Sequence, residues 1–211
     1  QVFECSPTLS LVSTEPPFPQ HNQQVTVYFN AAYGNGGLFD YEGDIYAHTG
    51  VITNLSQTTT DWKYVKTEWG ENTPETKLTR VDDNLYSITF SNIREYYGVP
   101  ASEEIHYMAF VFRSGEEQPG GYYLEQKNAD GSDILLFVYP NAINVKIINP
   151  TRREPLASPN SVLMVCAEAM LNEQLSLYID DTQLLSVNGS SIAWPSVLQG
   201  LEPGSYWLKA V

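Results

Sequence analysis

The sequence predicts an all-β fold, with two antiparallel, immunoglobulin-like β-sandwich domains in tandem. Short runs of alternating polar and apolar residues, rich in aromatic and β-branched side chains, recur along most of the chain, which is typical of strands buried on one face. Clusters of Gly, Asn, Asp and Ser separate these runs and predict tight turns. With 211 residues, of which 42% are hydrophobic, the chain can build one large or two small cores.

Six strand-like runs occupy the first part of the chain. A helix-like segment at 91–97 interrupts them, and we expect it to be one or two turns long, capped by Ser91 or Asn92 and ended by Gly98. The first 20 residues are rich in proline and predict an extra strand or arm. The six runs are 24–29, 44–52, 62–66, 84–90, 105–113 and 134–139.

A change in charge indicates a domain boundary near residue 141. Residues 1–140 hold 19 acidic and 7 basic side chains, whereas 141–211 hold 6 and 4. We expect a β-sandwich over 1–140 and a small immunoglobulin-like sandwich over 141–211, with Asp180 and Asp181 in a hairpin turn. The chain ends inside a strand-like run, so we expect it to belong to a longer protein. The strand-like runs of the second domain are 143–148, 161–168, 175–179, 183–187 and 206–211.

The net charge of −14 narrows the class of partner. A surface that neutralises phosphates needs clustered Lys and Arg, so we expect no nucleic-acid partner and no adsorption to an anionic membrane. No apolar run approaches the roughly 20 residues of a membrane-spanning helix, so we expect no transmembrane segment.

Two cysteines, Cys5 and Cys166, lie far apart and lack the spacing of metal ligands. We expect two buried structural thiols, and a disulfide joining the ends of the chain is the alternative. Gln1 is compatible with removal of a signal peptide, which would make the protein secreted.

No constellation for catalysis is found. The chain has no Gly-x-Ser-x-Gly turn, Cys166 lies in an apolar run, and His48 and His106 lie in predicted strands. Carboxylate pairs such as Glu103 and Glu104 are neighbours in predicted turns, whereas a glycosidase needs two that face each other across a cleft. The sequence therefore predicts no enzymatic activity for this chain.

Aromatic residues, 12% of the chain, are the informative feature of the first domain. As a strand, 61–69 would place Trp62, Tyr64 and Lys66 on one face, with Trp69 at its end. A sugar ring has an apolar C–H face and a polar rim, so flat aromatic groups beside polar side chains suit it. Trp62 and Trp69 are therefore platform candidates, with core packing of one indole as the alternative, and Tyr46 and Lys66 complete the candidate carbohydrate-binding set.

Two further patterns in the first domain are candidate binding features besides this aromatic set. Tyr96-Tyr97 and Tyr122-Tyr123 offer rival aromatic surfaces, with one ring of each pair expected in the core. In 128–133, oxygen ligands alternate around a glycine as they do in calcium loops, with Asp130 and Asp133 as candidate Ca²⁺ ligands. Because the loop lacks the later bidentate Glu, we expect an ordinary turn and no cofactor.

Several of these segments, taken together, resemble a known family. The first domain resembles the N-terminal module of secreted bacterial α-amylase-type enzymes of glycoside hydrolase family 13, from bacteria that forage starch with outer-membrane binding proteins. The resemblance covers about residues 24–138, and residues 141–211 are similar to a generic immunoglobulin-like linker module. The segments that carry it are 34–38 (GNGGL), 41–53 (YEGDIYAHTGVIT), 61–65 (DWKYV), 69–72 (WGEN), 96–100 (YYGVP) and 109–113 (AFVFR).

The resemblance implies a non-catalytic piece of such an enzyme. Its first domain would bind α-glucan (starch or maltooligosaccharide) on an aromatic platform, with Trp62 and Trp69 carried over as platform residues and Tyr46 and Lys66 beside them. A C-terminal catalytic domain of the same chain would follow, since a (β/α)₈ barrel needs about 250 residues. The implied location is secreted, at the cell surface or in the periplasm of a Gram-negative bacterium. The alternative hypothesis is that both domains are structural, packing on the parent enzyme or a partner without binding sugar.

Overall fold

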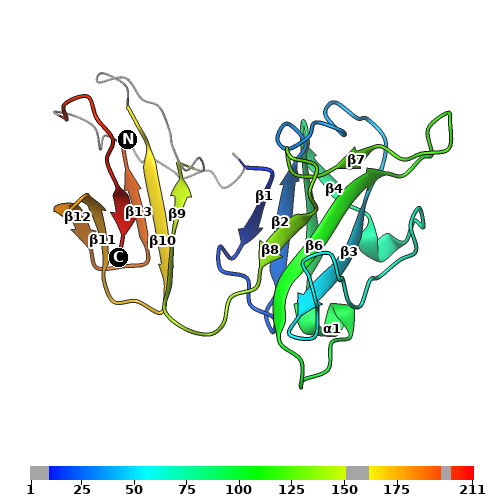
Figure 1. The fold of residues 1–211 in the computed structure, drawn as a ribbon, viewed down its shortest axis with the longest axis horizontal. Helices are drawn as coiled ribbons and strands as arrows, with labels where there is room; N and C mark the ends of the chain where they lie inside the picture. The colour runs from blue at the N-terminus through cyan, green and yellow to red at the C-terminus, as the bar shows by residue number, and fades with distance from the viewer. Residues whose placement is uncertain (1–9, 151–161, 196–200) are drawn as a thin grey trace. The chain divides into compact units, whose positions relative to one another are not determined.

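A computed structural model describes residues 10–150, 162–195 and 201–211 of the protein (Figure 1). Regular structure in these ranges is nearly all β, arranged in antiparallel sheets, which confirms the predicted all-β class. The chain divides into two compact units, one spanning Thr8–Pro140 and the other containing Asn141–Val211. We call them the N-terminal and C-terminal units and describe each by itself.

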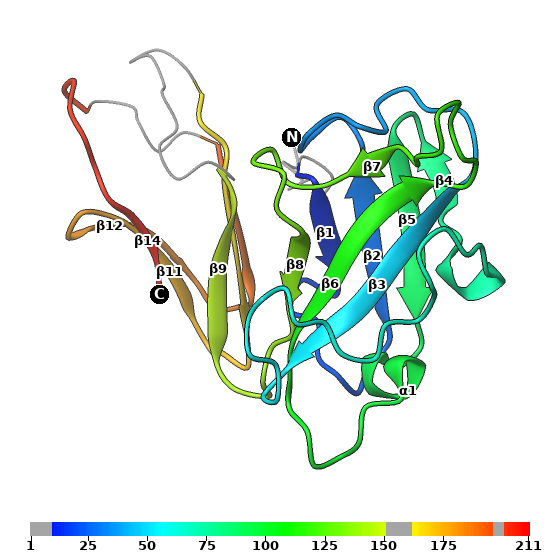
Figure 2. The same ribbon diagram turned by 45° about the vertical axis from the view of Figure 1, so that its right-hand side comes forward.

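The N-terminal unit is a sandwich of two antiparallel sheets, which Figure 2 shows as two layers with β3 and β6 in front. One sheet has the order β1-β2-β5-β4. In the other, β3 pairs with β6, whose far side pairs with both β7 and β8. The strands are β1 (Val12–Glu15), β2 (Val25–Asn30), β3 (Ile45–Thr53), β4 (Thr79–Asp82), β5 (Leu85–Phe90), β6 (Ile105–Ser114), β7 (Glu125–Gln126) and β8 (Ile134–Phe137).

An aromatic core joins the two sheets. In β2 the side chains of Val25, Val27 and Phe29 are fully buried, and the residues between them are partly exposed, as the alternating sequence predicts. Phe29 stacks on Phe112 of β6, with ring centroids 4.2 Å apart. This contact links one sheet to the other and removes both rings from solvent.

The predicted helix is confirmed as α1 (Ile93–Tyr97). The Asn92 side chain accepts a hydrogen bond from the Glu95 N–H, and Gly98 ends the helix with φ at 73°, a left-handed conformation that favours glycine. The only other helical turn in the described ranges is the 3₁₀ turn Pro74–Thr76. Neither has the length and apolar character that a membrane-spanning helix requires.

The free edge of β3 is covered by neighbouring main chain. Two loop segments run along the edge that does not pair with β6 and form hydrogen bonds of 2.8–3.0 Å with it. The bonds join Lys63 with Val51 in both directions, the Lys66 N–H with the Thr49 carbonyl, and the Leu78 N–H with the Ile45 carbonyl.

The predicted strand at 62–66 is wrong. Only Lys63 forms a β-bridge, and Tyr64 has φ at 53°, a left-handed conformation that breaks the alternation of side chains. Consequently Trp62 and Lys66 do not share a face with Tyr64.

The C-terminal unit contains two three-stranded antiparallel sheets, β13-β10-β9 and β12-β11-β14, around a small aliphatic core that includes Val165, Leu177 and Ile192. The predicted hairpin turn at Asp180 is confirmed, because Ile179 pairs with Thr182 across it. The strands are β9 (Asn144–Asn149), β10 (Val165–Met170), β11 (Leu175–Ile179), β12 (Thr182–Val187), β13 (Ser191–Trp194) and β14 (Leu208–Ala210).

Cys166 lies in β10, is 1% exposed, and is disulfide-bonded. The expectation of a structural thiol at this position is therefore wrong. The chain's other cysteine, Cys5, lies outside the described residues.

Candidate functional site

The outer face of the β3–β6 pair carries the candidate residues. Ile45 and Ala47 of β3 point into the core, so Tyr46 and His48 point outward. Tyr46 lies opposite Arg113 of β6 in the register. This face receives the loop that runs from Trp62 to Asn72.

Six side chains on this face form a continuous group, which we call the outer aromatic cluster. The His48 imidazole lies nearly parallel to the Trp62 indole, with centroids 5.8 Å apart, and the rings of Trp69 and His48 form a T-shaped pair with centroids 5.1 Å apart. Trp69 also meets Tyr123 edge to face at 6.2 Å. The six residues are Tyr46, His48, Trp62, Trp69, Arg113 and Tyr123.

Trp69 is the exposed member of the cluster, with 45% of its surface accessible. Trp62 is only partly exposed, and its Nε1–H is buried without a hydrogen-bond partner among the described residues. Tyr46 and Tyr123 are also partly buried. The cluster therefore presents one indole to solvent and supports it with a layer of half-buried rings.

Arg113 lies between two of these rings. Its guanidinium carbon is 5.0 Å from the Tyr123 ring centroid and 5.5 Å from that of Tyr46, distances typical of cation–π contacts. Its Nη1 donates to the Ser114 carbonyl at 2.9 Å, and Nη2 donates to the Glu71 carbonyl. Arg113 is 1% exposed, and this burial lowers the pKa of its guanidinium.

His48 lies between the two indoles. Burial lowers the pKa of His48, and the positive charge of Arg113 lowers it further, while Asp133 and Glu68 act in the opposite direction. Its Nδ1 is buried and unpartnered within the described part of the chain. A neutral imidazole therefore serves as a third flat ring in this group.

Lys66 does not join the cluster. Its ammonium donates to the Tyr96 carbonyl at 2.8 Å and lies 4.9 Å from the centroid of the Tyr96 ring. Of the four predicted carbohydrate-binding residues, the structure brings Tyr46, Trp62 and Trp69 together and places Lys66 against α1.

Sequence reasoning missed Arg113 and did not connect Tyr123 with Trp69. The period of two along β6 places Arg113 on the outer face, but no local pattern shows that a loop will bury it. The signal in the sequence was Gly70 beside Trp69, which is typical of a turn; in the structure its φ is 85°, which favours glycine, and its Cβ position lies 2.9 Å from the Tyr123 hydroxyl.

The segment 128–133, expected to be an ordinary turn with a calcium loop as the alternative, is closed by its own hydrogen bonds. One oxygen of Asp130 accepts from both the N–H and the hydroxyl of Ser132, and Asp133 lies 3.5 Å from the Lys127 ammonium. The first of these arrangements is an Asx turn. The described residues contain no group of three or more His, Cys, Asp or Glu side chains that could hold a metal ion.

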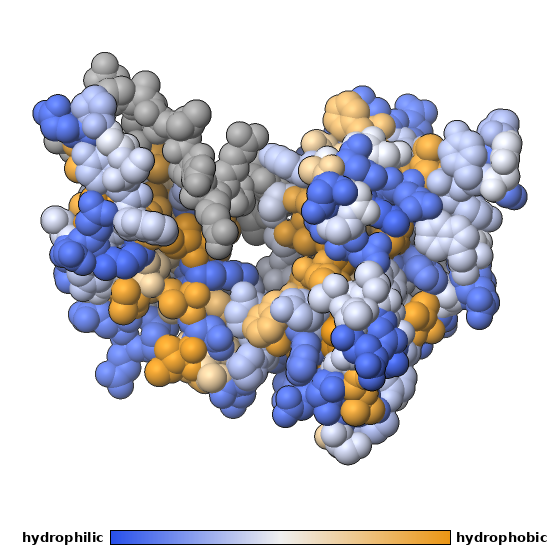
Figure 3. Space-filling model, viewed as in Figure 1, coloured by the Kyte–Doolittle hydropathy of each residue, from blue (hydrophilic) through white to orange (hydrophobic). Residues whose placement is uncertain are grey.

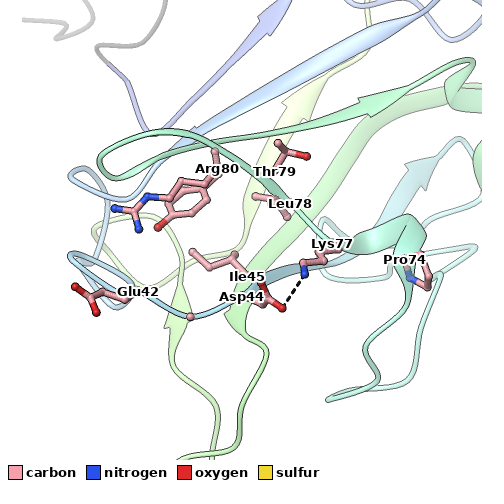
Figure 4. A pocket seen from close by; sticks show the side chains of 10 residues that line it. Glu42, Asp44, Ile45, Pro74, Lys77, Leu78, Thr79 and Arg80 are labelled. Atoms are coloured by element: carbon pink, nitrogen blue, oxygen red, sulfur yellow. Dashed lines mark hydrogen bonds and ion pairs between the residues drawn. The ribbon is translucent and has the colours of Figure 1, made fainter.

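A pocket of about 460 Å³ lies at the start of β3, beside β4 (Figure 4). The ammonium of Lys77 is paired with Asp44 at 2.7 Å, and Arg80 is paired with Asp83 at 3.1 Å. The two basic side chains that line the pocket are thus paired with carboxylates. No residue of the outer aromatic cluster lines this pocket.

Comparisons with known proteins do not assign the chain to a family. No protein-family model matches the sequence, and no curated protein matches it either.

Proposed function

We propose that the N-terminal unit binds α-glucan, as starch or maltooligosaccharide, through the outer aromatic cluster and without catalysing a reaction. In this proposal the two units form a non-catalytic part of a secreted α-amylase-type enzyme of a Gram-negative bacterium. The C-terminal unit then separates the glucan-binding unit from a catalytic domain of the same chain.

The observation that carries the proposal is the exposure of Trp69 above a layer of aromatic rings. An indole that is 45% accessible offers a flat apolar face, which suits the C–H face of a glucose ring. The partly buried rings of His48 and Tyr123, which contact Trp69, limit its movement, so little conformational entropy is lost when a sugar stacks on it. A neutral ligand also fits the net charge of −14, because it requires no basic surface.

The surroundings of Trp69 are polar, as sugar binding requires. The visible face of the N-terminal unit mixes hydrophilic and hydrophobic residues (Figure 3). Near Trp69 in the chain, the exposed carboxylates of Glu68 and Glu71 lie in the same turn, where they can accept hydrogen bonds from sugar hydroxyls.

Affinity electrophoresis in gels that contain amylopectin tests this function. We expect the wild-type protein to be retarded, and Trp69→Ala to migrate as it does without polysaccharide. Trp207→Ala is the matched control, because Trp207 is 79% exposed and belongs to the C-terminal unit. Equal mobility of the wild-type protein with and without amylopectin would remove the proposal.

A structural role is the second candidate, and the packing of the partly buried Trp62 indole on His48 favours it. In that case the cluster stabilises the unit or packs on a partner, and the polysaccharide has no effect. Acrylamide quenching of tryptophan fluorescence, with and without maltoheptaose, separates the two: protection of Trp69 by the sugar supports binding, and unchanged quenching supports the structural role.

A further inference from the structure

Arg113 is buried at a high energetic cost. Transfer of a charge out of water is unfavourable unless ion pairs and hydrogen bonds replace the lost hydration. Arg113 forms no ion pair with a described carboxylate, and its Nε–H is buried without a described partner. Its compensation comes from two backbone carbonyls and two tyrosine rings, so the surrounding structure is organised around this side chain.

One of those carbonyls belongs to the turn that carries Trp69. The turn closes on itself, because the Glu71 N–H donates to the Glu68 carbonyl at 3.2 Å and the Glu68 N–H donates to the Glu71 carboxylate at 3.1 Å. Arg113 donates to the carbonyl of Glu71, which joins the turn to the end of β6.

Asn72 provides a second connection between the same two segments. Its Nδ2 donates to the Gly115 carbonyl at 2.9 Å, and the Gly115 N–H donates to the Asp44 carbonyl at 2.7 Å. The turn is therefore attached at two consecutive residues, Glu71 and Asn72, to the strand end formed by 113–115, and Trp69 lies two residues before Glu71 in the chain.

We propose that Arg113 and Asn72 are positioning residues for Trp69. Their hydrogen bonds hold the turn 68–72 against the sheet, so that the exposed indole is presented in one orientation, with its ring plane nearly perpendicular to those of His48 and Tyr123. This inference rests on the proposed function and adds the element that prepares the site for its ligand. It predicts that loss of either hydrogen bond weakens binding although neither side chain touches the sugar.

The test combines a binding measurement with a local signature of Trp69. The four tryptophans give four indole N–H signals in a ¹H–¹⁵N spectrum, and Trp69→Phe identifies that of Trp69. Arg113→Met removes the guanidinium, Arg113→Lys keeps the charge but not the planar fork, and Asn72→Ala removes the second bond. Arg80→Met is the control, since Arg80 is an exposed arginine of the same unit, paired with Asp83.

In the variants of Arg113 we expect the Trp69 signal to shift and the Kd for maltoheptaose to rise about tenfold, with a rise of about threefold in Asn72→Ala. The signals of Trp194 and Trp207 stay in place, and Arg80→Met behaves as the wild-type protein does. If Arg113→Met does not fold, Asn72→Ala carries the test, because Asn72 is exposed.

Three results would overturn the inference while leaving the proposed function in place. An unmoved Trp69 signal in the folded variants shows that the two bonds do not position the indole, and unchanged affinity shows that the position does not matter. Wild-type affinity in Arg113→Lys shows that the charge alone suffices. If the wild-type protein itself does not bind maltoheptaose, the proposed function is overturned together with this inference, which distinguishes that failure from the others.

Discussion

The imidazole of His48 stacks on the indole of Trp62, with an angle of 27° between the ring planes and 5.8 Å between their centroids. Protonation of His48 places a positive charge in this half-buried position, near the guanidinium of Arg113. The neutral form is therefore favoured in the folded protein, which couples the stability of the N-terminal unit to pH.

The first prediction concerns this coupling. The pKa of His48 is lowered in the folded state from its ordinary value of 6.5, chiefly by burial. Below pH 6.5 the unfolded chain binds a proton that the folded unit resists, so the free energy of unfolding falls as the pH drops from 6.5 toward the folded-state pKa. Above pH 6.5 His48 is neutral in both the folded and the unfolded state, so its full contribution to the free energy of unfolding is present.

Urea unfolding of the N-terminal unit between pH 5 and 8 measures this effect. In His48→Gln the free energy of unfolding should depend less on pH. The dependence that remains should come from His21, whose pKa is lowered by burial and by the charge of Arg94. His106→Gln, at an exposed position, serves as the control. A slope that is unchanged in His48→Gln would contradict the prediction.

Thr49→Val should destabilise the N-terminal unit by about 1–3 kcal/mol. The buried Thr49 hydroxyl is 2.6 Å from the hydroxyl of Tyr97 and donates to the Ala109 carbonyl at 2.8 Å. Valine fills the same space but leaves the buried Tyr97 hydroxyl without this partner. Denaturant unfolding measures the loss, and Thr26→Val, whose hydroxyl is paired at the surface, should change stability by less than about 0.5 kcal/mol.

Gly70→Ala should destabilise the unit and disturb Trp69. A Cβ at this position would lie 2.9 Å from the Tyr123 hydroxyl oxygen, and the φ of 85° is strained for alanine. Gly36→Ala is the comparison variant. Gly36 also has a positive φ, 74°, but has open space around its Cβ position, so this variant measures the backbone strain without a contact to Tyr123. The difference in unfolding free energy between the two variants reports the crowding against Tyr123, and equal losses would show that strain alone acts.

Reduction should destabilise the C-terminal unit by about 2–4 kcal/mol, because Cys166 is disulfide-bonded in its core strand β10. A thiol reagent applied to the unfolded, unreduced protein should find no reactive Cys166, and the same reagent should modify it after reduction. Peptide mass mapping checks the position, and labelling of Cys166 before reduction would contradict the structure.

Strands that bury one face could be predicted from the sequence, whereas strands without such a face could not. The run of β2 shows Val25, Val27 and Phe29 alternating with polar residues, and all three are buried. In β4, by contrast, every side chain is exposed, so no alternation marks the strand Thr79–Asp82. The alternation at 62–66 was misleading because Tyr64 adopts a left-handed conformation between Lys63 and Lys66, whose main chains bond to β3.

The candidate site, like the strands, could be predicted from the sequence only in part. The shared face of Tyr46 and His48 follows from the period of a strand, and in the structure His48 contacts Trp62 and Trp69 while Tyr46 contacts Arg113. The departure of Lys66 toward Tyr96 and the burial of Arg113 under the turn 68–72 depend on contacts between distant segments, which no local pattern contains.

The covered edge of β3 bears on how the protein behaves in solution. An open strand edge offers unpaired N–H and C=O groups to any other extended chain, which is a common route to aggregation. Here main-chain groups of Ile45, Thr49 and Val51 on this edge already bond to Leu78, Lys66 and Lys63. The loop that supplies Lys63 and Lys66 continues to Trp69, so one segment both covers this edge of β3 and carries the exposed indole.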